Sequence, residues 1–245
     1  MRTFGLIGFP LEHSFSPGYF SEKFFREGIG DAEYKLFPLD QIEDLEQLFK
    51  TQPDLCGLNV TIPYKQVVMR YLDGLDVHAQ AMGAVNTIRF EEGNKIGFNT
   101  DWIGFRDAIS PMLNPDAQYK ALVLGTGGSS KAVHYALKQM GIESASVSRE
   151  IREGVEFSYK TLGRADVGAH KIIINTTPLG MHPDTMSRPD IPYEAIGPDH
   201  ILFDLVYNPE KTVFLIKGEQ QGAAVKNGLE MLHRQAEASW TIWNA

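Results

Sequence analysis

The stretch KALVLGTGGSSKAV, residues 120–133, restricts the fold of this 245-residue chain more than any other segment. An apolar strand signal ends at Leu124, glycines follow at Gly125, Gly127 and Gly128, and apolar residues then recur at helical spacing. Small residues at such a turn let the backbone approach a pyrophosphate, which the helix N-terminus stabilises. A tight strand-to-helix connection without a ligand is the alternative, but the complete order of strand, turn and helix favours dinucleotide binding.

The strand after this helix indicates which dinucleotide is bound. SASVSR, residues 144–149, ends about 20 residues beyond the glycines, where a Rossmann domain recognises the ribose. An acidic residue there accepts from a 2′-hydroxyl, whereas an arginine suits a 2′-phosphate. Arg149 occupies this place and favours NADP. Glu150 and Arg152 follow and also fit a solvated charge cluster; alternation along an extended strand would turn Glu150 away from the phosphate.

The α/β pattern extends over two domains. Before Asp101, the strand signals TFGLIG, EYKLFPL and CGLNVT alternate with helix signals, and AVNTIRF and KIGFN indicate a hairpin. After it, the strand signals KALVL, SASVS, KIIIN and ILFDLV are separated by helices or loops. We therefore predict a mixed, mainly parallel α/β domain over residues 1–101 and a Rossmann dinucleotide-binding domain over residues 102–227.

The last segment, residues 228–245, is predicted to be an amphipathic helix, which could pack on either domain. Its inward face consists of residues at helical spacing: Leu229, Leu232, Ala236, Ser239, Trp240 and Trp243.

Composition excludes several classes of function. The net charge of −8 includes no basic run, so a nucleic-acid surface is not expected. The chain has no apolar run of about 18 residues and no signal peptide, so we expect a cytoplasmic protein without a membrane partner. A single cysteine, Cys56, rules out an internal disulfide, and the histidines lack ligand spacing, so no metal site is expected. His13 is expected to make local hydrogen bonds.

Two serines follow the first strand, in EHSFSPGYF. Ser16 precedes Pro17 and could be the N-cap of a helix. Ser14 has no such explanation. Because ligands of α/β proteins bind at the carboxyl ends of parallel strands, the two hydroxyls could instead hold a ligand carboxylate. The spacing leaves both interpretations open.

The stretch LNVTIPYK places a lysine where a helix should not favour one. Pro63 is suited to the first position of a helix, and the apolar residues after it have helical spacing. Lys65 would then lie in the first turn, where the positive end of the helix dipole opposes a cation. This position predicts that Lys65 is there for function.

Polar residues also interrupt apolar runs elsewhere. Asn86 lies in GAVNTI, Thr100 and Asp101 lie in FNTDW, and Tyr207 lies in the loop FDLVYNPEKT. Each by itself could be a turn residue. Of the residues in that last loop, Tyr207 is the one best able to donate a hydrogen bond to an anion.

These motifs together resemble those of the shikimate dehydrogenase family. The motifs occur in the family's order: SxSP at 14–17, NVTIPxK at 59–65, GAVNT at 83–87, NTD at 99–101, GTGGSS at 125–130, NTTPLG at 175–180, YNPEKT at 207–212, and GLxML with Gln235. The resemblance runs almost end to end. It implies a two-domain oxidoreductase that reduces 3-dehydroshikimate to shikimate with NADPH.

The resemblance also implies roles for individual residues. Lys65 and Asp101 would be the catalytic pair, and the last helix would return to the substrate domain. The substrate carboxylate would be bound by Ser14, Ser16 and Tyr207, and the substrate hydroxyls by Thr61, Asn86, Asp101 and Gln235. The cofactor would be bound by Gly125, Gly127, Gly128, Ser129, Ser148, Arg149, Thr176, Met181 and Gly228. An ammonium directed at the ketone oxygen can stabilise the developing alkoxide and deliver its proton.

The chain departs from the family's pattern at several positions. Tyr19 and Phe20 replace a usual His-Asn pair and Trp102 replaces a frequent glycine, changes that could reshape the substrate pocket. Glu150 stands where threonine is common, which affects the preference for NADP. A quinate or shikimate dehydrogenase that uses NAD, or a non-catalytic cofactor-binding sensor, is the alternative function. Retention of both Lys65 and Asp101 argues against the sensor. A monomer and a homodimer are both compatible with the sequence.

Overall fold

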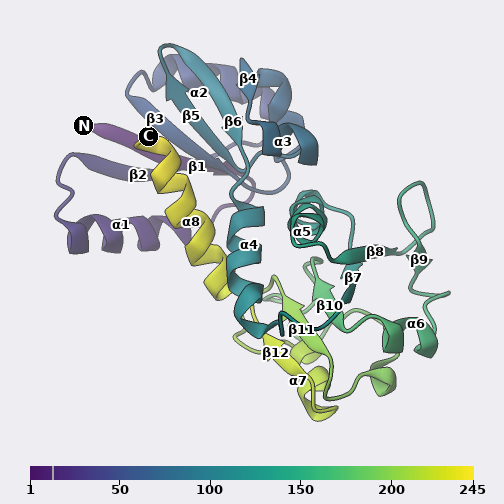
Figure 1. The fold of residues 1–245 in the computed structure, drawn as a ribbon. Helices are drawn as coiled ribbons and strands as arrows, with labels where there is room; N and C mark the ends of the chain where they lie inside the picture. The colour runs from purple at the N-terminus through teal and green to yellow at the C-terminus, as the bar shows by residue number, and fades with distance from the viewer. Residues whose placement is uncertain (13) are drawn as a thin grey trace. The chain divides into compact units, whose positions relative to one another are not determined.

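A computed structural model describes residues 1–12 and 14–245, so the expectation for His13 lies outside the described residues. The chain forms two compact units, which are described one at a time. Unit 1 consists of residues Met1–Thr100 and Ala236–Ala245, and unit 2 consists of Asp101–Gln235. Each unit has its own sheet (Figure 1).

Unit 1 contains a six-stranded mixed sheet in the order β2-β1-β3-β5-β6-β4. The three strands at one side are parallel, as the alternation of strand and helix signals predicts: β1 Arg2–Gly8, β2 Ala32–Pro38 and β3 Leu55–Val60. The hairpin of β5 Thr87–Glu91 and β6 Asn94–Phe98 pairs antiparallel with β3, and the short β4 Gly74–Leu75 is parallel to β6.

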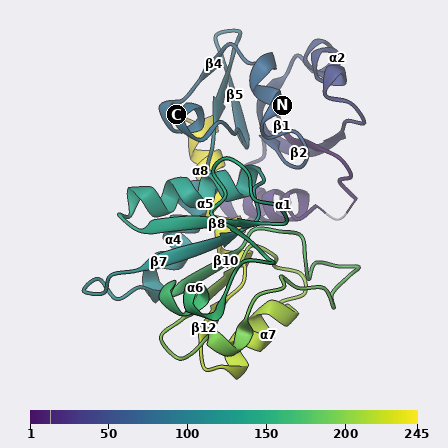
Figure 2. The same ribbon diagram turned by 90° about the vertical axis from the view of Figure 1, so that its right-hand side faces the viewer.

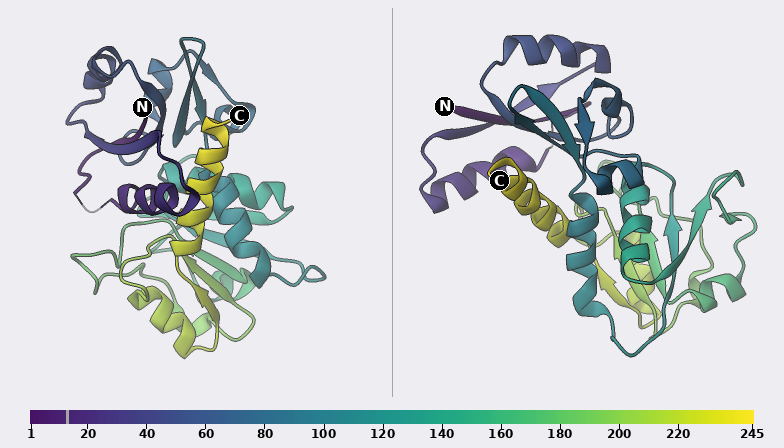
Figure 3. Two further views of the ribbon diagram at one scale, coloured as in Figure 1. Left: turned by 90° about the vertical axis from the view of Figure 1, so that its left-hand side faces the viewer. Right: turned by 45° about the horizontal axis from the view of Figure 1, so that its top comes forward.

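Helical elements cover both faces of this sheet. One face packs against the α-helices α2 Leu45–Thr51 and α3 Val77–Met82 and the 3-10 helices η1 Ile42–Asp44 and η2 Val67–Tyr71. The other face packs against α1 Ser16–Glu27 and the end of α8 Leu229–Trp243 through a mainly aromatic core (Figure 3). In that core, Trp243 stacks on Phe4 with ring centroids 4.9 Å apart.

Unit 2 contains a six-stranded parallel sheet in the order β12-β11-β10-β7-β8-β9. Its strands are β7 Lys120–Leu124, β8 Glu143–Ser148, β9 Phe157–Ser158, β10 Ile172–Asn175, β11 Ile201–Asp204 and β12 Ala224–Lys226. The order reverses between β7 and β10, which is the order of a Rossmann fold. Ligands of such sheets bind at this reversal, outside the carboxyl ends of the strands.

Helices lie on both faces of this second sheet (Figure 2). On one face, α4 Asp101–Ile109 packs against α5 Gly128–Gln139, and the ring of Phe105 contacts that of Phe203 at 5.1 Å. The other face is covered by α6 Arg164–Ala169 and α7 Val213–Gln220. The 3-10 helices of the unit are η3 Ser110–Met112 and η4 Tyr193–Ala195. The predicted two-part α/β fold is therefore confirmed.

The boundaries differ in detail from those expected. The division falls between Thr100 and Asp101, and it cuts the last helix between Gln235 and Ala236. The expected first domain covers residues 1–101, joined by the last helix over residues 228–245. The assignment of one domain to the substrate and the other to the cofactor stays a prediction.

The helix predicted to begin at Pro63 does not form. Residues 63–66 form turns and irregular loop, and only the five-residue η2 follows. Lys65 therefore lies in a loop, not in the first turn of an α-helix, and the helix-dipole argument for its unusual position is wrong. The apolar spacing that suggested a helix is used by η2, where Val68 is fully buried in the core.

Candidate active site

The carboxyl ends of β1 and β3 carry the first group of expected substrate residues. Thr61 directly follows β3, and its amide donates to the carbonyl of Ile7 at the end of β1, 2.9 Å away. The amide of Val60 donates to the Asn86 carbonyl at 2.8 Å. Thr61 and Asn86 are therefore held at the same edge of the sheet, which is the edge where ligands of α/β proteins bind.

The backbone of Lys65 is held at this same edge. Its carbonyl accepts a hydrogen bond of 2.7 Å from the amide of Val85, the residue before Asn86. The neighbouring Tyr64 is 6% exposed and donates its hydroxyl to the carbonyl of Leu39 at 2.6 Å. The loop is thus fixed on both sides of the sheet edge, and it brings Lys65 close in space to the GAVNT segment.

The side chain of Asn86 organises the corner that leads to Asp101. Its Oδ1 accepts from the amide of Thr100 at 2.7 Å, and its Nδ2 donates to Thr100 Oγ1 at 3.0 Å. The Asn99 amide donates to the Ala84 carbonyl at 2.9 Å. Asn86, Asn99 and Thr100 are buried and their side-chain hydrogen bonds hold this corner of the backbone, and their contact with substrate stays a prediction. Asp101 follows directly and is 5% exposed.

The structure decides against one interpretation of Ser16. The helix α1 begins at Ser16, the N-cap position is Phe15, and no side chain caps the helix. Ser16 is therefore not an N-cap. Burial raises the pKa of the Tyr34 hydroxyl, and the nearby hydroxyl of Ser16 offsets part of this rise. Ser14 lies in the loop before α1, and its amide donates to the Leu11 carbonyl at 3.1 Å.

In unit 2, Gln235 lies against the helix that Asp101 begins. A Cβ added to Gly104 would lie 3.1 Å from the Cβ of Gln235, so this glycine permits close packing of α4 and α8. Gln235 is 9% exposed, and its Nε2 donates to the Leu232 carbonyl at 2.9 Å. Asp101 precedes Gly104 by one turn, so the two expected hydroxyl-binding side chains come from adjoining helices.

The glycine-rich turn after β7 has the shape that a pyrophosphate requires. Gly125 has φ +110°, and a Cβ there would lie 2.7 Å from Thr176 Oγ1. Thr176 Oγ1 donates to the Leu124 carbonyl at 2.7 Å, and Ser130 Oγ donates to the Gly125 carbonyl at 2.9 Å. No side chain caps the start of α5, which leaves its first amides for a ligand oxygen. The turn therefore fits a dinucleotide phosphate.

The residues expected at the ribose lie just beyond a strand. β8 ends at Ser148, and Arg149 and Glu150 are exposed in the bend that follows. The alternation argument for Glu150 therefore does not apply, because these residues are not extended. Arg152 does not fit a merely solvated cluster, since it donates to Thr126 Oγ1 within the glycine-rich turn. Ser129, in the first turn of α5, is half-buried.

The remaining expected residues lie in loops of unit 2. Tyr207 follows β11, and burial raises the pKa of its hydroxyl. Met181, after β10, is 46% exposed. Gly228 contacts the Leu205 carbonyl, and a Cβ would collide with it. The ligand contacts of Tyr207, Met181 and Gly228 stay predictions.

A buried carboxylate connects the loops that carry Thr176 and Tyr207. Asp204 accepts from Thr212 Oγ1 at 2.6 Å, from Asn175 Nδ2 at 3.0 Å and from the Val206 amide at 3.0 Å. Burial raises the pKa of Asp204 to about 6, although these three donors favour its charged form. Sequence reasoning did not single out this cluster.

The residues that depart from the family pattern pack against nearby side chains. The Tyr19 hydroxyl donates to Glu237 on α8, and the fully buried Phe20 stacks on Tyr34 with ring centroids 4.4 Å apart. In unit 2, the ring of Trp102 contacts that of Tyr135 at 5.5 Å. The Phe20 ring belongs to the aromatic core of unit 1, and its effect on the substrate pocket stays a prediction.

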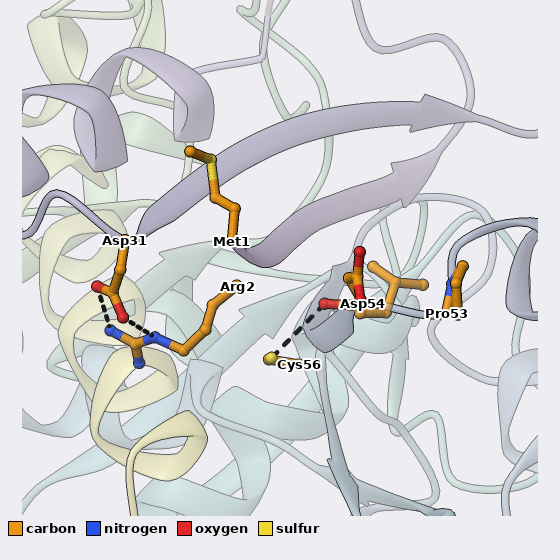
Figure 4. A pocket seen from close by; sticks show the side chains of 7 residues that line it. Met1, Arg2, Asp31, Pro53, Asp54 and Cys56 are labelled. Atoms are coloured by element: carbon orange, nitrogen blue, oxygen red, sulfur yellow. Dashed lines mark hydrogen bonds and ion pairs between the residues drawn. The ribbon is translucent and has the colours of Figure 1, made fainter.

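A hollow of about 310 Å³ lies elsewhere in unit 1, where β1 and β3 begin (Figure 4). Arg2 and Asp31 line it and pair with each other at 2.9 Å. The Arg2 guanidinium lowers the pKa of the Asp31 carboxyl by its hydrogen bond. Cys56 also lines the hollow, with its Sγ 3.6 Å from the Asp54 carbonyl. Because the hollow lies at the amino ends of the strands, away from the edge where ligands of α/β sheets bind, we do not assign the reaction to it.

Two further findings bear on function. No described helix has the length and apolar character needed to cross a membrane. Over residues 1–12 and 14–245, no group of three or more His, Cys, Asp or Glu side chains could hold a metal ion.

Sequence reasoning missed a set of buried polar residues in unit 1. Asn59, Thr87 and Ser239 are at most 5% exposed and are hydrogen-bonded to one another. One signal was available, because Ser239 is a polar residue on the otherwise apolar face of the last helix. Its partners could not be named, since they lie far away in the sequence.

Known proteins similar to this chain are dehydrogenases. Residues 6–88 match the family described as shikimate dehydrogenase substrate binding domain. The chain is 36% identical to shikimate dehydrogenase (NADP(+)) of Methanococcus vannielii, over 98% of this chain and 90% of that protein.

Solved structures agree with this likeness. Shikimate 5-dehydrogenase from Thermus thermophilus, in complex with NADP(H) and shikimate, has a TM-score of 0.88 at 30% identity. Quinate dehydrogenase from Corynebacterium glutamicum, in complex with NAD, has a TM-score of 0.87 at 26% identity. Each alignment covers 99% of this chain and 93% of the other.

Proposed function

This chain belongs to the shikimate dehydrogenase family, and we propose that it catalyses the NADP-dependent interconversion of 3-dehydroshikimate and shikimate. The relative from Methanococcus vannielii is named shikimate dehydrogenase (NADP(+)), and its alignment covers nearly the whole of this chain. The family, the enzyme class and the NADP cofactor expected from the sequence are thereby confirmed. The individual site residues, the location in the cell and the oligomeric state stay predictions.

The observation that most supports this proposal is the shared anchoring of Lys65 and Asn86 at one edge of the first sheet. The hydrogen bond from Val85 to the Lys65 carbonyl joins the two motifs that carry them. Asn86 in turn fixes Thr100, the residue before Asp101. One compact backbone arrangement thus supports an ammonium, a carboxamide and the start of a carboxylate-bearing helix.

In the proposed reaction, Lys65 stabilises the oxygen of the substrate ketone as negative charge develops on it and gives that oxygen a proton. NADPH, when bound, supplies the hydride that the carbonyl carbon accepts. Asp101 bonds a neighbouring substrate hydroxyl and balances the ammonium charge. In the reverse direction, Lys65 removes the proton from the shikimate hydroxyl.

The other residues are proposed to hold the two ligands. Ser14, Ser16 and Tyr207 offer hydroxyls to the substrate carboxylate, and Thr61 and Gln235 bond its hydroxyls. The amides of the turn at Gly125, Gly127 and Gly128 and the start of α5 bind the pyrophosphate. Arg149 binds the 2′-phosphate, and Arg152 lies close enough to the turn through Thr126 to add a second positive charge.

An assay of the purified protein tests this proposal. Shikimate and quinate are each combined with NADP and NAD, and formation of the reduced nicotinamide is followed by absorbance. We expect the highest kcat/KM for shikimate with NADP. A protein that binds NADP but reduces it with neither substrate would be a sensor. A preference for quinate with NAD would identify a quinate dehydrogenase.

A further inference from the structure

The fully buried hydroxyl of Ser239 lies at the centre of the polar cluster in unit 1. Ser239 Oγ is 2.8 Å from Thr87 Oγ1 and 3.1 Å from Thr100 Oγ1, and it accepts from Asn59 Nδ2 at 3.0 Å. Ser239 and both threonines have no exposed surface. A hydroxyl taken out of water in this way is favourable only with its partners in place.

We infer that Ser239 is a positioning residue, through which the last helix aligns Asn86 and the corner that leads to Asp101. This inference rests on the proposed function. Thr87 follows Asn86 and donates to its Oδ1 at 3.0 Å, and Thr100 precedes Asp101. The Ser239 hydroxyl therefore bonds to the residue next to each of the two expected substrate ligands.

The orientation of Asn59 is fixed from its other side. Tyr34 donates its hydroxyl to Asn59 Oδ1 at 2.8 Å, which turns Nδ2 toward Ser239. The Tyr34 ring is in turn stacked on Phe20, with an interplanar angle of 13°. Because Nδ2 also donates to the Asn86 carbonyl at 3.3 Å, and a carbonyl can only accept, the amide of Asn59 has this one orientation.

The helix segment that carries Ser239 is also firmly attached to unit 1 (Figure 3). Trp243 Nε1 donates to the Ile88 carbonyl at 3.0 Å, and Glu237 pairs with the buried ammonium of Lys23 at 2.8 Å. These contacts lie on either side of Ser239 along the helix. A rigidly held hydroxyl can constrain its partners, whereas a mobile one cannot.

Packing alone does not require a serine at this position. Ala236, Trp240 and Trp243 on the same helix face are apolar or aromatic, and alanine is both smaller and a better helix former than serine. Ser239→Ala should therefore fold and should leave the helix in place. Its defect should be one of alignment at Asn86 and Asp101.

The test is a kinetic comparison of Ser239→Ala with wild type in the full-length protein. We expect kcat/KM for shikimate to fall about 5-fold to 30-fold, because lost alignment affects the reacting geometry. KM for NADP should change less than about 2-fold. Ser239→Cys, which keeps a weak donor of similar size, should recover part of the loss.

Two further variants separate positioning from general stability. Thr3→Val removes another buried hydroxyl of unit 1, which bonds Glu33 at the amino end of β1, and should lower the melting temperature without changing shikimate kinetics by more than about 2-fold. In an Asn86→Ala background, Ser239→Ala should have little further effect, because its influence passes through Asn86.

The outcomes are distinguishable. If wild type does not turn over shikimate, the proposed function fails and this role fails with it. If wild type is active and Ser239→Ala is equally active, or if its effect is undiminished without Asn86, the positioning role alone is overturned. A loss of shikimate activity in Thr3→Val equal to that in Ser239→Ala would also overturn it.

Discussion

At the scale of single residues, the backbone of Lys65 is held by the fold, whereas its side chain is proposed to act in the reaction. Its carbonyl is bonded by Val85 and the adjacent Tyr64 is buried, so truncating the side chain should leave the loop in place. We expect Lys65→Ala to lower kcat about 100-fold to 1000-fold, because the lost interaction is strongest when charge develops on the substrate oxygen. Steady-state kinetics with shikimate and NADP measure this.

The matched control is Lys50→Ala, which removes an exposed lysine of the same unit from the last turn of α2. It should leave kcat unchanged. Near-normal turnover in Lys65→Ala would mean that Lys65 is an ordinary loop lysine and that the proton comes from another group.

Asp204 is expected to make stability depend on pH. Burial raises its pKa from 3.8 to about 6 in the folded state, so the folded protein holds this proton more tightly than the unfolded chain. The resulting stability is complete below about pH 4 and is lost as the pH rises through about 6. Two pKa units correspond to roughly 2 to 3 kcal/mol.

Asp204→Asn, which resembles the protonated form, should remove this dependence. Urea unfolding between about pH 4 and pH 8 should show the variant gaining roughly 2 to 3 kcal/mol relative to wild type as the pH rises. Asp116→Asn, an exposed change of equal charge, corrects for overall charge effects. Parallel pH profiles for Asp204→Asn and wild type would show that the carboxyl titrates normally.

At the scale of elements, the attachment of the last helix to β3 depends on a glycine. A Cβ on Gly57 would collide with Nε1 of Trp243, whose ring is stacked on Phe4 and bonded to Ile88. We expect Gly57→Ala to destabilise the protein by roughly 1 to 3 kcal/mol, since the buried ring has little room to move. Urea unfolding of the variant measures this cost.

Gly18→Ala is the comparison for this change. Gly18 lies in α1, and nothing is within 4 Å of an added Cβ, so this variant should be as stable as wild type or gain up to about 1 kcal/mol from helix propensity. Equal unfolding midpoints for Gly57→Ala and wild type would contradict the observed packing of Trp243 on β3.

Elements with a long periodic signal were predictable, and short or irregular ones were not. The strand, turn and helix at residues 120–133 were expected from sequence and are present as β7 and α5. The strands β4 and β9 have two residues each and were missed, because a period of two residues cannot be recognised in so short a run. The segment after Pro63 has helical spacing but forms only turns and the short 3-10 helix η2, whose Val68 is buried in the core of unit 1.

The candidate site was predictable only in part, for a related reason. Motifs identified Lys65 and Asn86, but the partner of Ser16 lies on β2 and that of Ser239 on β3, each brought near only by folding. The local sequence favours an N-cap at Ser16. In the structure Ser16 does not cap the helix, and its hydroxyl lies near that of Tyr34. Arg152 was undervalued because its contact with Thr126 spans 26 residues.

At the scale of the whole molecule, the two units have separate cores, and all the expected cofactor residues lie in unit 2. The substrate residues Thr61, Lys65 and Asn86 lie in unit 1, whereas the glycine-rich turn and Arg149 lie in unit 2. The chain passes between the units after Thr100 and again after Gln235. Changes at the expected cofactor residues should therefore affect chiefly the kinetic constants of NADP.

Cofactor choice is the clearest test of this separation. Arg149 is exposed just after β8 and can bond a 2′-phosphate with its guanidinium. Such charge-assisted bonds contribute about 1.5 to 3 kcal/mol, so NADP should be preferred over NAD roughly 10-fold to 100-fold. Arg149→Ala should remove most of that preference by raising KM for NADP, while kinetics with NAD and KM for shikimate stay nearly unchanged.

Glu150 decides how this result is interpreted, because it lies next to Arg149 in the same exposed bend. If its carboxylate points away from the ribose, Glu150→Thr should change cofactor preference by less than about 2-fold. If it faces the ribose, it repels the phosphate, and wild type should use NAD as well as NADP until Glu150→Thr shifts the preference toward NADP. Measuring kcat/KM for both cofactors in wild type and the two variants decides between these orientations, and an unaltered preference in Arg149→Ala would assign the phosphate to Arg152 instead.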